Sequence, residues 1–399
     1  MHLKYLNYKF LLTLFLSVCF FGFSAAPLSE RARISLLTCD QGNEIYSLFG
    51  HSAIRVQDPE LGIDEVYNWG MFEFSENELL FGYDFAKGRL LYFLGKQKYQ
   101  NFIYEYLYYK RGVREQLLNL NEQQKEKLYI ALQENYLPEN RAYKYDFFYD
   151  NCSSRIRDIL ITNIGENLSL ATHSDDNKYS FRNIIDLRLQ NTPWLDLGID
   201  LVLGKKIDVK ASNYHLMFLP IYMEEIVAKS TIKKENGKEE PLVANTTILL
   251  LSEQDQPTPP EDISFYFWTL LAACLLVGIL NINKLNNFYF GGLLLIGSLL
   301  GIILLFMWLG TDHQATKQNL NLIWANPLLA ISFLALFSKK WMAKLKYFFL
   351  GYTLILFVFV LFWFVSPQEF NFSIRPLILT FMLIHYFLFN KAKKLSKHT

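Results

Sequence analysis

The 399-residue chain has few of the residues that build metal centres or disulfide frameworks. It contains four cysteines and seven histidines, and it has neither an HExxH motif nor paired CxxC motifs, so no metal site is expected. It also lacks a phosphate-binding glycine loop and a GxSxG nucleophile elbow. Its formal net charge is only +1, which offers no basic face to nucleic acid. We therefore expect no cofactor and no nucleic-acid partner.

Long apolar runs are scarce except at the start of the chain and in its last third. Residues 1–26 have the pattern of a secretory signal peptide, with lysines before an apolar stretch at 10–23 and small residues ending at Ala26. An uncleaved anchor is the alternative, because Pro27 directly follows the alanines. The residues after this segment are expected outside the cytoplasm.

The last third of the chain contains five apolar segments, each close to the roughly 20 residues that cross hydrocarbon. These predicted spans are 263–282, 288–309, 320–338, 347–365 and 372–390. Lysines concentrate in the loops on one side of the spans and in the C-terminal tail, whereas the other side carries only Lys317 and Arg375. The positive-inside rule therefore predicts a cytoplasmic C-terminus, with residues 27–262 outside.

The sequence thus divides into five predicted parts. They are a signal peptide at 1–26, an extracytoplasmic Cys/His domain at 27–251, a linker at 252–262, a five-helix membrane domain at 263–390 and a basic cytoplasmic tail at 391–399. The exported domain is long enough for one core and has an α+β pattern. Its predicted strands are 34–38, 53–56 and 65–69, and its predicted helices are 121–135, a helix after Asn151, and 179–190.

One thiol and one imidazole in the exported domain have the context of a nucleophile and its base. Asp150 or Asn151 is a natural helix N-cap, which places Cys152 in the first helical turn. There the helix dipole and the free backbone N–H groups favour the thiolate, and the same N–H groups could hold an oxyanion. His51 follows Gly50 at the start of a predicted strand and is the best candidate to accept the thiol proton.

Several alternatives remain open at this candidate site. A third polar group usually orients such a histidine; Asn68 is our choice, with Asp64 and Tyr67 as rivals. Cys152 and His51 could also be ordinary core residues. In an oxidising compartment Cys39 and Cys152 could instead form a disulfide.

A polar loop between the second and third predicted spans carries Asp312 and His313. The predicted topology places this loop at the outer membrane surface, on the same side as Cys152. It is either a simple interfacial loop or a segment that contacts a lipid headgroup or orients the exported domain.

The chain resembles the Lnb N-terminal periplasmic domain at these same residues. The matching motifs are LTCDQGNEIYSLFGHSAIRV at 37–56, VYNWG at 66–70, YDFFYDNCSSRIRD at 145–158, PWLDLGID at 193–200, MFLP at 217–220 and the outer loop at 311–327. The resemblance covers almost the whole chain, and the motifs together are specific. One departure is Asp40-Gln41, where a pair containing glycine or proline is expected.

The resemblance implies a multi-pass enzyme of the inner (cytoplasmic) membrane that N-acylates lipoproteins, with its N-terminal domain in the periplasm. Cys152 would be the nucleophile and His51 its base. The supporting residues expected from these motifs and loops are Asn151, Tyr67, Arg155, Asp312 and His313. The order of histidine before cysteine also resembles the circularly permuted NlpC/P60-type papain-like domains, whose superfamily includes acyltransferases that work through a thioester.

The expected partners are a phospholipid acyl donor, a lipoprotein acceptor and the membrane itself. Cys152 would take the acyl chain as a thioester and pass it to the α-amino group of a diacylglyceryl-cysteine. Two other readings use the same residues: a membrane-tethered cysteine peptidase or amidase of the cell envelope, and a non-catalytic scaffold in which Cys152 is structural.

Overall fold

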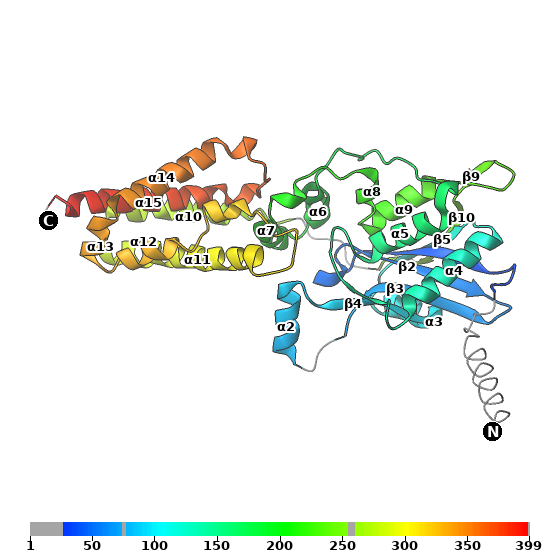
Figure 1. Ribbon diagram of the computed structural model, residues 1–399. Coiled ribbons are helices and arrows are strands. Elements are labelled where there is room, and N and C mark those ends of the chain that lie inside the picture. Colours follow the sequence, from blue (N-terminus) through cyan, green and yellow to red (C-terminus); the bar gives the residue numbers. More distant parts are fainter. Residues whose placement is uncertain (1–26, 74–76, 254–259, 398–399) are drawn as a thin grey trace, which may run out of the picture.

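The computed structural model describes residues 27–73, 77–253 and 260–397, and the predicted signal peptide lies outside these ranges. The described chain forms an α+β lobe and a helical lobe, joined end to end (Figure 1). This arrangement agrees with the predicted order of an α+β domain followed by helices.

The α+β lobe is built on a seven-stranded antiparallel sheet with the order β10-β5-β1-β2-β3-β4-β6. Its strands are β1 (Arg33–Cys39), β2 (His51–Asp58), β3 (Ile63–Met71), β4 (Leu91–Lys98), β5 (Val113–Leu118), β6 (Ala142–Lys144) and β10 (Val243–Leu250). A small sheet adds β7 (Leu168–Ser169), β8 (Thr231–Lys233) and β9 (Glu239–Pro241). All three predicted strands fall within β1, β2 and β3.

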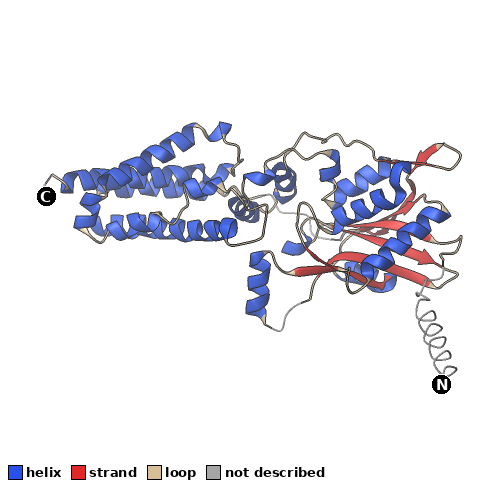
Figure 2. Ribbon diagram, in the orientation of Figure 1, coloured by secondary structure: helices blue, strands red, loops and turns tan. Residues whose placement is uncertain are grey.

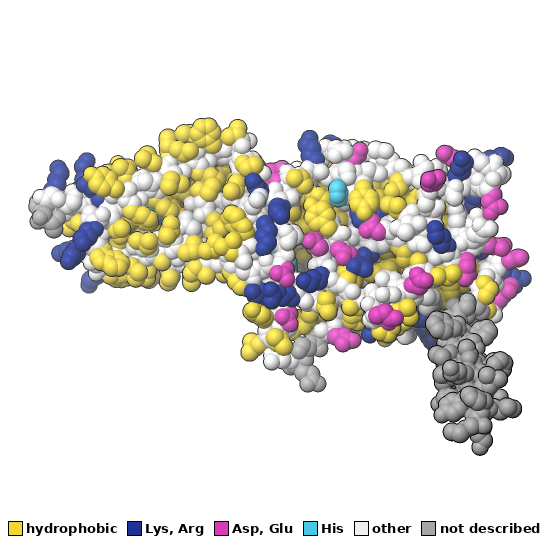
Figure 3. Space-filling view, viewed as in Figure 1, with side chains coloured by type: hydrophobic (Ala, Val, Ile, Leu, Met, Phe, Trp, Pro, Cys, Tyr) yellow, Lys and Arg dark blue, Asp and Glu magenta, His cyan; other side chains and the backbone are white. Residues whose placement is uncertain are grey.

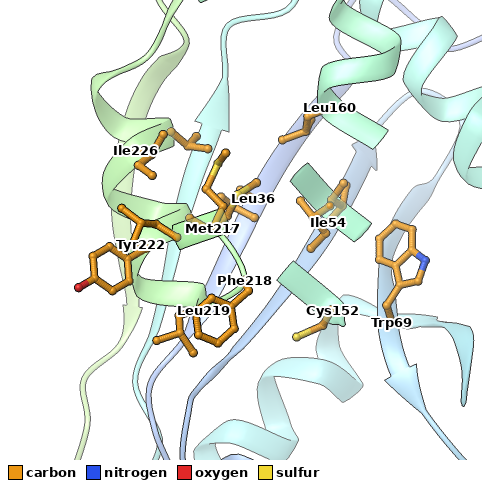
Figure 4. Packing of buried hydrophobic residues seen from close by; sticks show 14 of the residues in the cluster. Leu36, Ile54, Trp69, Cys152, Leu160, Met217, Phe218, Leu219, Tyr222 and Ile226 are labelled. Carbon is orange, nitrogen blue, oxygen red and sulfur yellow. The ribbon is translucent and has the colours of Figure 1, made fainter. Parts of the chain in front are cut away.

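Helices cover both faces of the large sheet (Figure 2). The helices of this lobe are α2 (Glu78–Lys87), α3 (Tyr99–Tyr108), α4 (Glu122–Tyr136), α5 (Cys152–Ile164), α6 (Phe181–Leu189), α7 (Pro193–Val202), α8 (Asn213–Leu216) and α9 (Pro220–Lys229). Alternation along the strands sends Leu36, Ile54 and Trp69 to the main core under α4, α5 and α9, while Ala53 and Val66 pack against α3. Figure 4 shows Cys152 at one end of the main core.

Local signals fix the helices that were predicted. α4 begins after Asn121, whose side chain forms a capping box with Gln124, and α5 begins after Asn151 with the same arrangement. α6 begins after Ser180, close to the predicted start of that helix. Each cap satisfies amides that would otherwise lack a partner in the first turn.

The helical lobe consists mainly of four apolar helices that run side by side. Its helices are α10 (Ser264–Leu280), α11 (Asn283–Leu309), α12 (Leu329–Ala335), α13 (Lys339–Lys344), α14 (Lys346–Leu361) and α15 (Arg375–Leu395). Within the described residues, the segments Asn283–Leu309 and Phe372–Leu395 are long and apolar enough to cross a membrane, and α10 and α14 are shorter apolar helices. Exposed apolar side chains cover this lobe (Figure 3).

The structure departs from the five predicted spans in two places. Residues 320–338 do not form one helix: a short 3-10 turn at Leu320–Ile323 is followed by a break and by α12. Pro327 lies in this break, where it cannot supply the N–H of a continuous helix. The helix of the last predicted span runs past residue 390, because α15 ends at Leu395 and so takes in part of the predicted tail.

The two lobes share a packed and hydrogen-bonded junction. Leu197 of α7 is buried in the same apolar cluster as Trp324 and Phe381 of the helical lobe. The side chain of Asn319 donates to the carbonyl oxygens of Leu201 and Val202 at the end of α7, at 2.7 and 3.0 Å. The exported domain is thus seated on the helices through α7, which the sequence did not predict.

Candidate active site

Cys152 is held at the N-terminus of α5 by the residue before it. The Asn151 side chain accepts from the Ser154 amide at 2.9 Å, and its Nδ2 donates to the carbonyl oxygens of Phe147 and Phe218 at 2.7 and 2.8 Å. These bonds join α5 to two loops and fix the first turn. Since the cap occupies the Ser154 amide, the amides of Cys152 and Ser153 remain at the open end of the helix.

His51 is the first residue of β2 and its imidazole contacts both Asn68 and Cys152. Gly50, just before it, has φ +79°, and a Cβ there would lie 2.7 Å from the Cys39 carbonyl oxygen. His51 Nε2 lies 2.5 Å from Asn68 Oδ1 on β3, and the ring is hydrogen-bonded to the Cys152 thiol. With Nε2 engaged by Asn68, Nδ1 is the nitrogen available to the sulfur.

The electrostatics of this pair favour the charged forms. Burial raises the pKa of the Cys152 thiol, but the charge and hydrogen bond of His51 and the backbone N–H groups of Ser52 and Ser153 outweigh it, so the pKa lies below its ordinary value. Burial lowers the pKa of His51, yet the charge of Cys152 and the hydrogen bonds to Cys152 and Asn68 raise it above its ordinary value. Both shifts act toward a thiolate beside an imidazolium, the direction in which a cysteine becomes more reactive.

Two buried serines tie the strand that carries His51 to the helix that carries Cys152. The hydroxyl groups of Ser52 and Ser153 lie 2.7 Å apart, and both side chains are fully buried. Because Ser52 follows His51 and Ser153 follows Cys152, this one hydrogen bond fixes how His51 and Cys152 lie relative to each other.

Cys39 is close to the site but has a different character. All three cysteines of the described residues (Cys39, Cys152 and Cys274) are free, so the structure does not contain the alternative Cys39–Cys152 disulfide. Cys39 lies directly opposite His51 in the β1–β2 ladder. Burial raises the pKa of its thiol to about 12 despite a hydrogen bond with Tyr106, so it stays a protonated, unreactive group at neutral pH.

The same segments of the chain match two parts of one protein family. Residues 26–188 match the Lnb N-terminal periplasmic domain, and residues 253–395 match the Lnb transmembrane domain. The chain belongs to the Lnb family. It is therefore an inner-membrane protein of lipoprotein processing with a periplasmic N-terminal domain. No curated protein and no solved structure matches the chain, and the likeness to permuted NlpC/P60 domains stays a prediction.

Two residues that were rivals of Asn68 lie elsewhere in this Lnb chain. Tyr67 points to the opposite face of β3, where it is fully buried and its hydroxyl accepts a hydrogen bond from Gln133 at 2.8 Å. Asp64 forms a bidentate ion pair with Arg55 at 2.8 and 2.9 Å. Tyr67 was predicted as a supporting residue, but strand alternation directs consecutive side chains to opposite faces, so it cannot join Asn68 beside His51.

Arg155 supports the helix start rather than the sulfur. Its guanidinium binds the Asp150 carboxylate at 2.6 and 2.8 Å and stacks 3.6 Å from the centre of the Tyr143 ring. Asp150 and Arg155 therefore clamp the turn that leads into Cys152. Arg155 is therefore placed to stabilise this turn and not to bind a substrate.

The predicted outer loop contacts the α2 region. Asp312 pairs with Arg89 at 3.2 Å and with Lys144 at 3.8 Å, and His313 Nε2 lies 3.2 Å from the Phe85 carbonyl oxygen. These bonds agree with the alternative in which the loop orients the exported domain, because they tie it to the end of α2 and to Arg89. Its contacts orient the periplasmic domain on the helices.

Sequence reasoning missed two tyrosines beside the thiol. Burial, followed by the neighbouring Cys152 charge, raises the pKa of both Tyr143 and Tyr145 above the ordinary value. Tyr143 lies on β6 and Tyr145 directly follows it, so both belong to the strand end nearest α5. The only indication of Tyr143 and Tyr145 in the sequence was their position just before the Asp150–Cys152 motif.

Three aspartates at the lobe junction are the one carboxylate cluster, among the described residues, with spacing suited to a metal ion. Asp186, Asp196 and Asp200 have oxygen atoms within 4.8 Å of one another. Protein side chains already bind these carboxylates. Arg182 binds Asp200 at 2.6 Å, and Asn371 donates to Asp196 and Asp200 at 3.0 and 3.1 Å. Burial and then the charges of Asp200 and Asp196 raise the pKa of Asp186 to about 9, so it is a neutral acid at pH 7.

Proposed function

We propose that this protein is a lipoprotein N-acyltransferase in which Cys152 carries the acyl group. The observation that supports this most is the row Cys152, His51 and Asn68 at the end of the sheet, in a domain seated directly on membrane helices. Membership of a lipoprotein-processing family supports a lipoprotein as substrate. The acyl donor is a phospholipid, and the acceptor is the free α-amino group of a diacylglyceryl-cysteine lipoprotein.

In the first half-reaction, the Cys152 thiolate attacks the ester carbonyl of the phospholipid. A tetrahedral oxyanion forms near the amide groups at the start of α5, which are placed to donate to it. The ester C–O bond then breaks, and the His51 imidazolium gives its proton to the departing lysophospholipid oxygen. The products are a Cys152 thioester, a lysophospholipid and a neutral imidazole.

In the second half-reaction, the neutral α-amino group of the lipoprotein attacks the thioester carbonyl. His51 takes the proton that the amine loses, the C–S bond breaks, and an amide forms. The thiolate–imidazolium pair is thereby restored. Both substrates are held in one bilayer next to the site, which replaces a search in solution by a search in two dimensions.

The same proposal gives the protein its orientation. The lysine-poor end of the helical lobe joins the periplasmic domain, and the lysine-rich loops and tail lie at the other end, so the C-terminus is cytoplasmic and the chain crosses the membrane several times. The thiol then faces the outer leaflet, where exported lipoproteins are anchored.

Mass spectrometry of lipoprotein N-terminal peptides tests this function. In cells that depend on this gene for N-acylation, the gene and a Cys39→Ala variant should both give triacylated N-termini, whereas removal of the gene or Cys152→Ala should leave the α-amino group free. Unchanged N-acylation after removal would contradict the proposal. Full activity of Cys152→Ala would indicate a scaffold, and altered cell-wall peptides without altered lipoproteins would indicate a peptidase or amidase.

A further inference from the structure

Helix α2 carries more exposed apolar surface than a helix in water normally does. Leu79 is 87% exposed, and Leu80, Tyr83 and Phe85 are each more than half exposed. A cluster of this kind on a soluble domain marks a contact surface. Because the helix has ten residues and a capped N-terminus, it is a formed element that presents this surface in a fixed direction.

Several bonds place α2 at the periplasmic end of the membrane helix α11. Lys87 Nζ donates to the Gly310 carbonyl oxygen at 2.6 Å and lies 5.6 Å from the Phe306 ring. The Asp312 amide donates to the Lys87 carbonyl oxygen at 2.8 Å. Figure 1 shows α2 next to this end of α11, standing out from the body of the periplasmic lobe. The apolar surface of α2 therefore continues the exposed apolar surface of α11, which ends at Leu309.

Positive side chains gather where the apolar lobe ends, as the dark blue groups in Figure 3 show. Arg89 and Lys144 share the single carboxylate of Asp312, and Lys206 donates to a neutral amide, that of Gln314. These three contacts leave an excess of positive charge at the level of α2. Such a belt suits the anionic headgroups of a phospholipid surface.

A row of aromatic rings connects α2 with the neighbourhood of Cys152. The Phe81 ring lies 6.0 Å from Phe72, Phe72 lies 5.3 Å from Tyr92, and Tyr92 is stacked at 4.5 Å on Tyr145. All four side chains are half-buried, so the row is reachable from outside instead of being sealed in the core. We call these four residues the aromatic row.

We propose that α2 lies in the outer leaflet and that the aromatic row binds the acyl chain between the leaflet and the Cys152 sulfur. The second half of this proposal rests on the proposed function and names a binding site for its acyl substrate. A row of rings offers a continuous apolar contact along which methylene groups can lie. The donor lipid then keeps its headgroup at the positive belt while its ester carbonyl reaches the thiol.

Depth-dependent quenching tests the membrane contact of α2 without any assumption about catalysis. The full-length protein carries Cys152→Ser and a fluorophore on Leu79→Cys, and it is reconstituted into phosphatidylcholine–phosphatidylglycerol vesicles with brominated acyl chains. The matched control carries the fluorophore on Leu107→Cys, a leucine of α3 that is 57% exposed. Quenching at position 79 and little at 107 is expected. Equal quenching at both positions would overturn the placement and leave α2 as a docking site for a protein.

Chain-length selectivity tests the aromatic row. Cys152 acylation is followed with palmitoyl and acetyl p-nitrophenyl esters, and the ratio of the two rates is compared between variants. Phe72→Ser and Tyr92→Ser should lower the palmitoyl-to-acetyl ratio by about tenfold, because lost apolar contact affects only the long chain. Tyr108→Ser on α3 should leave the ratio unchanged.

The results of the ester experiment distinguish a failure of the aromatic row from a failure of the proposed function. An unchanged ratio in Phe72→Ser and Tyr92→Ser would overturn the aromatic row while the acyltransferase activity stands. A wild-type protein whose Cys152 takes neither ester would overturn the proposed function and the row together, and the vesicle experiment would still decide where α2 lies.

Discussion

His51 and Asn68 are joined by a hydrogen bond between the imidazole Nε2 and the amide Oδ1, at 2.5 Å. An amide oxygen only accepts, so Nε2 carries the proton and Nδ1 is the ring nitrogen left for Cys152. The bond crosses from β2 to β3, two neighbouring strands of one sheet. Rigid strands therefore fix the direction of the base before any substrate binds.

Replacing Asn68 by Ala should slow acyl transfer by about 10- to 100-fold, less than the 10²- to 10⁴-fold that loss of a general base costs. The imidazole stays present in this variant but is no longer oriented. Initial rates of lipoprotein N-acylation measure the effect. Asn245→Ala removes an exposed asparagine from the edge strand β10 and should keep the full rate. Equal rates in both variants would show that Asn68 does not position the base.

The reactivity of Cys152 should depend on pH in a manner set by His51. The alkylation rate follows the thiolate fraction, which rises as the pH passes through the thiol pKa. Because the pKa of Cys152 is lowered by His51, the rise should come at lower pH than for an ordinary thiol. His51→Ala removes the charge and the hydrogen bond and should move the rise to higher pH.

Iodoacetamide labelling of the full-length protein, read by peptide mass spectrometry, measures this profile. Cys39 serves as the internal control, since its pKa of about 12 and its burial should keep it unlabelled near neutral pH. Identical profiles for Cys152 in the wild type and in His51→Ala would show that the imidazole does not activate the thiol.

Arg182 should be among the most important side chains for stability. It is 1% exposed and binds Asp200 at 2.6 Å and Asp208 at 2.7 Å. Arg182→Met leaves these buried carboxylates without their cation and should cost about 3–5 kcal/mol of unfolding free energy. Thermal unfolding in detergent micelles measures the loss. Arg188→Met, on the exposed side of the same helix α6, should change stability by less than about 0.5 kcal/mol.

Ser52 and Ser153 should behave as one unit. Ser153→Ala leaves the buried Ser52 hydroxyl without its partner, which costs about 1–3 kcal/mol, and Ser52→Ala does the same to Ser153. The double variant removes both polar groups and should lose less than the sum of the two single losses. Unfolding of the four proteins gives the coupling energy. Strict additivity would contradict a hydrogen bond between the two hydroxyls.

Local signals made much of this fold predictable. Asn121 and Asn151 are capping residues whose helices begin where expected, and His51 and Cys152 lie at the expected strand start and helix start. That these two ends meet could not be derived from the sequence. The choice of Asn68 over Tyr67 could not be derived from the pattern, because alternation shows that the two side chains face opposite sides but not which of them shares a side with His51. That required the register between β2 and β3, which pairs Ile54 with Tyr67.

The junction was beyond sequence reasoning for a related reason. The segment with Asn321, Asn326 and Pro327 is apolar enough on average to be predicted as a span, yet its backbone is irregular. Tertiary partners compensate: Asn326 Nδ2 donates to the Tyr352 hydroxyl at 2.7 Å, and Asn321 Nδ2 donates to the Leu201 carbonyl oxygen at 3.2 Å. Non-helical backbone of this kind is stable only where protein buries it, and composition does not report which neighbours do so.

The central claim is that Cys152 carries the acyl chain as a thioester. Intact-protein mass spectrometry tests it most directly, after the full-length protein in phospholipid nanodiscs has been denatured rapidly in the absence of lipoprotein acceptor. We predict an added acyl mass on the wild type and on Cys39→Ala that hydroxylamine removes and that Cys152→Ala lacks. An acyl adduct of equal abundance on Cys152→Ala, or no adduct on a wild-type protein that N-acylates lipoproteins, would contradict the account.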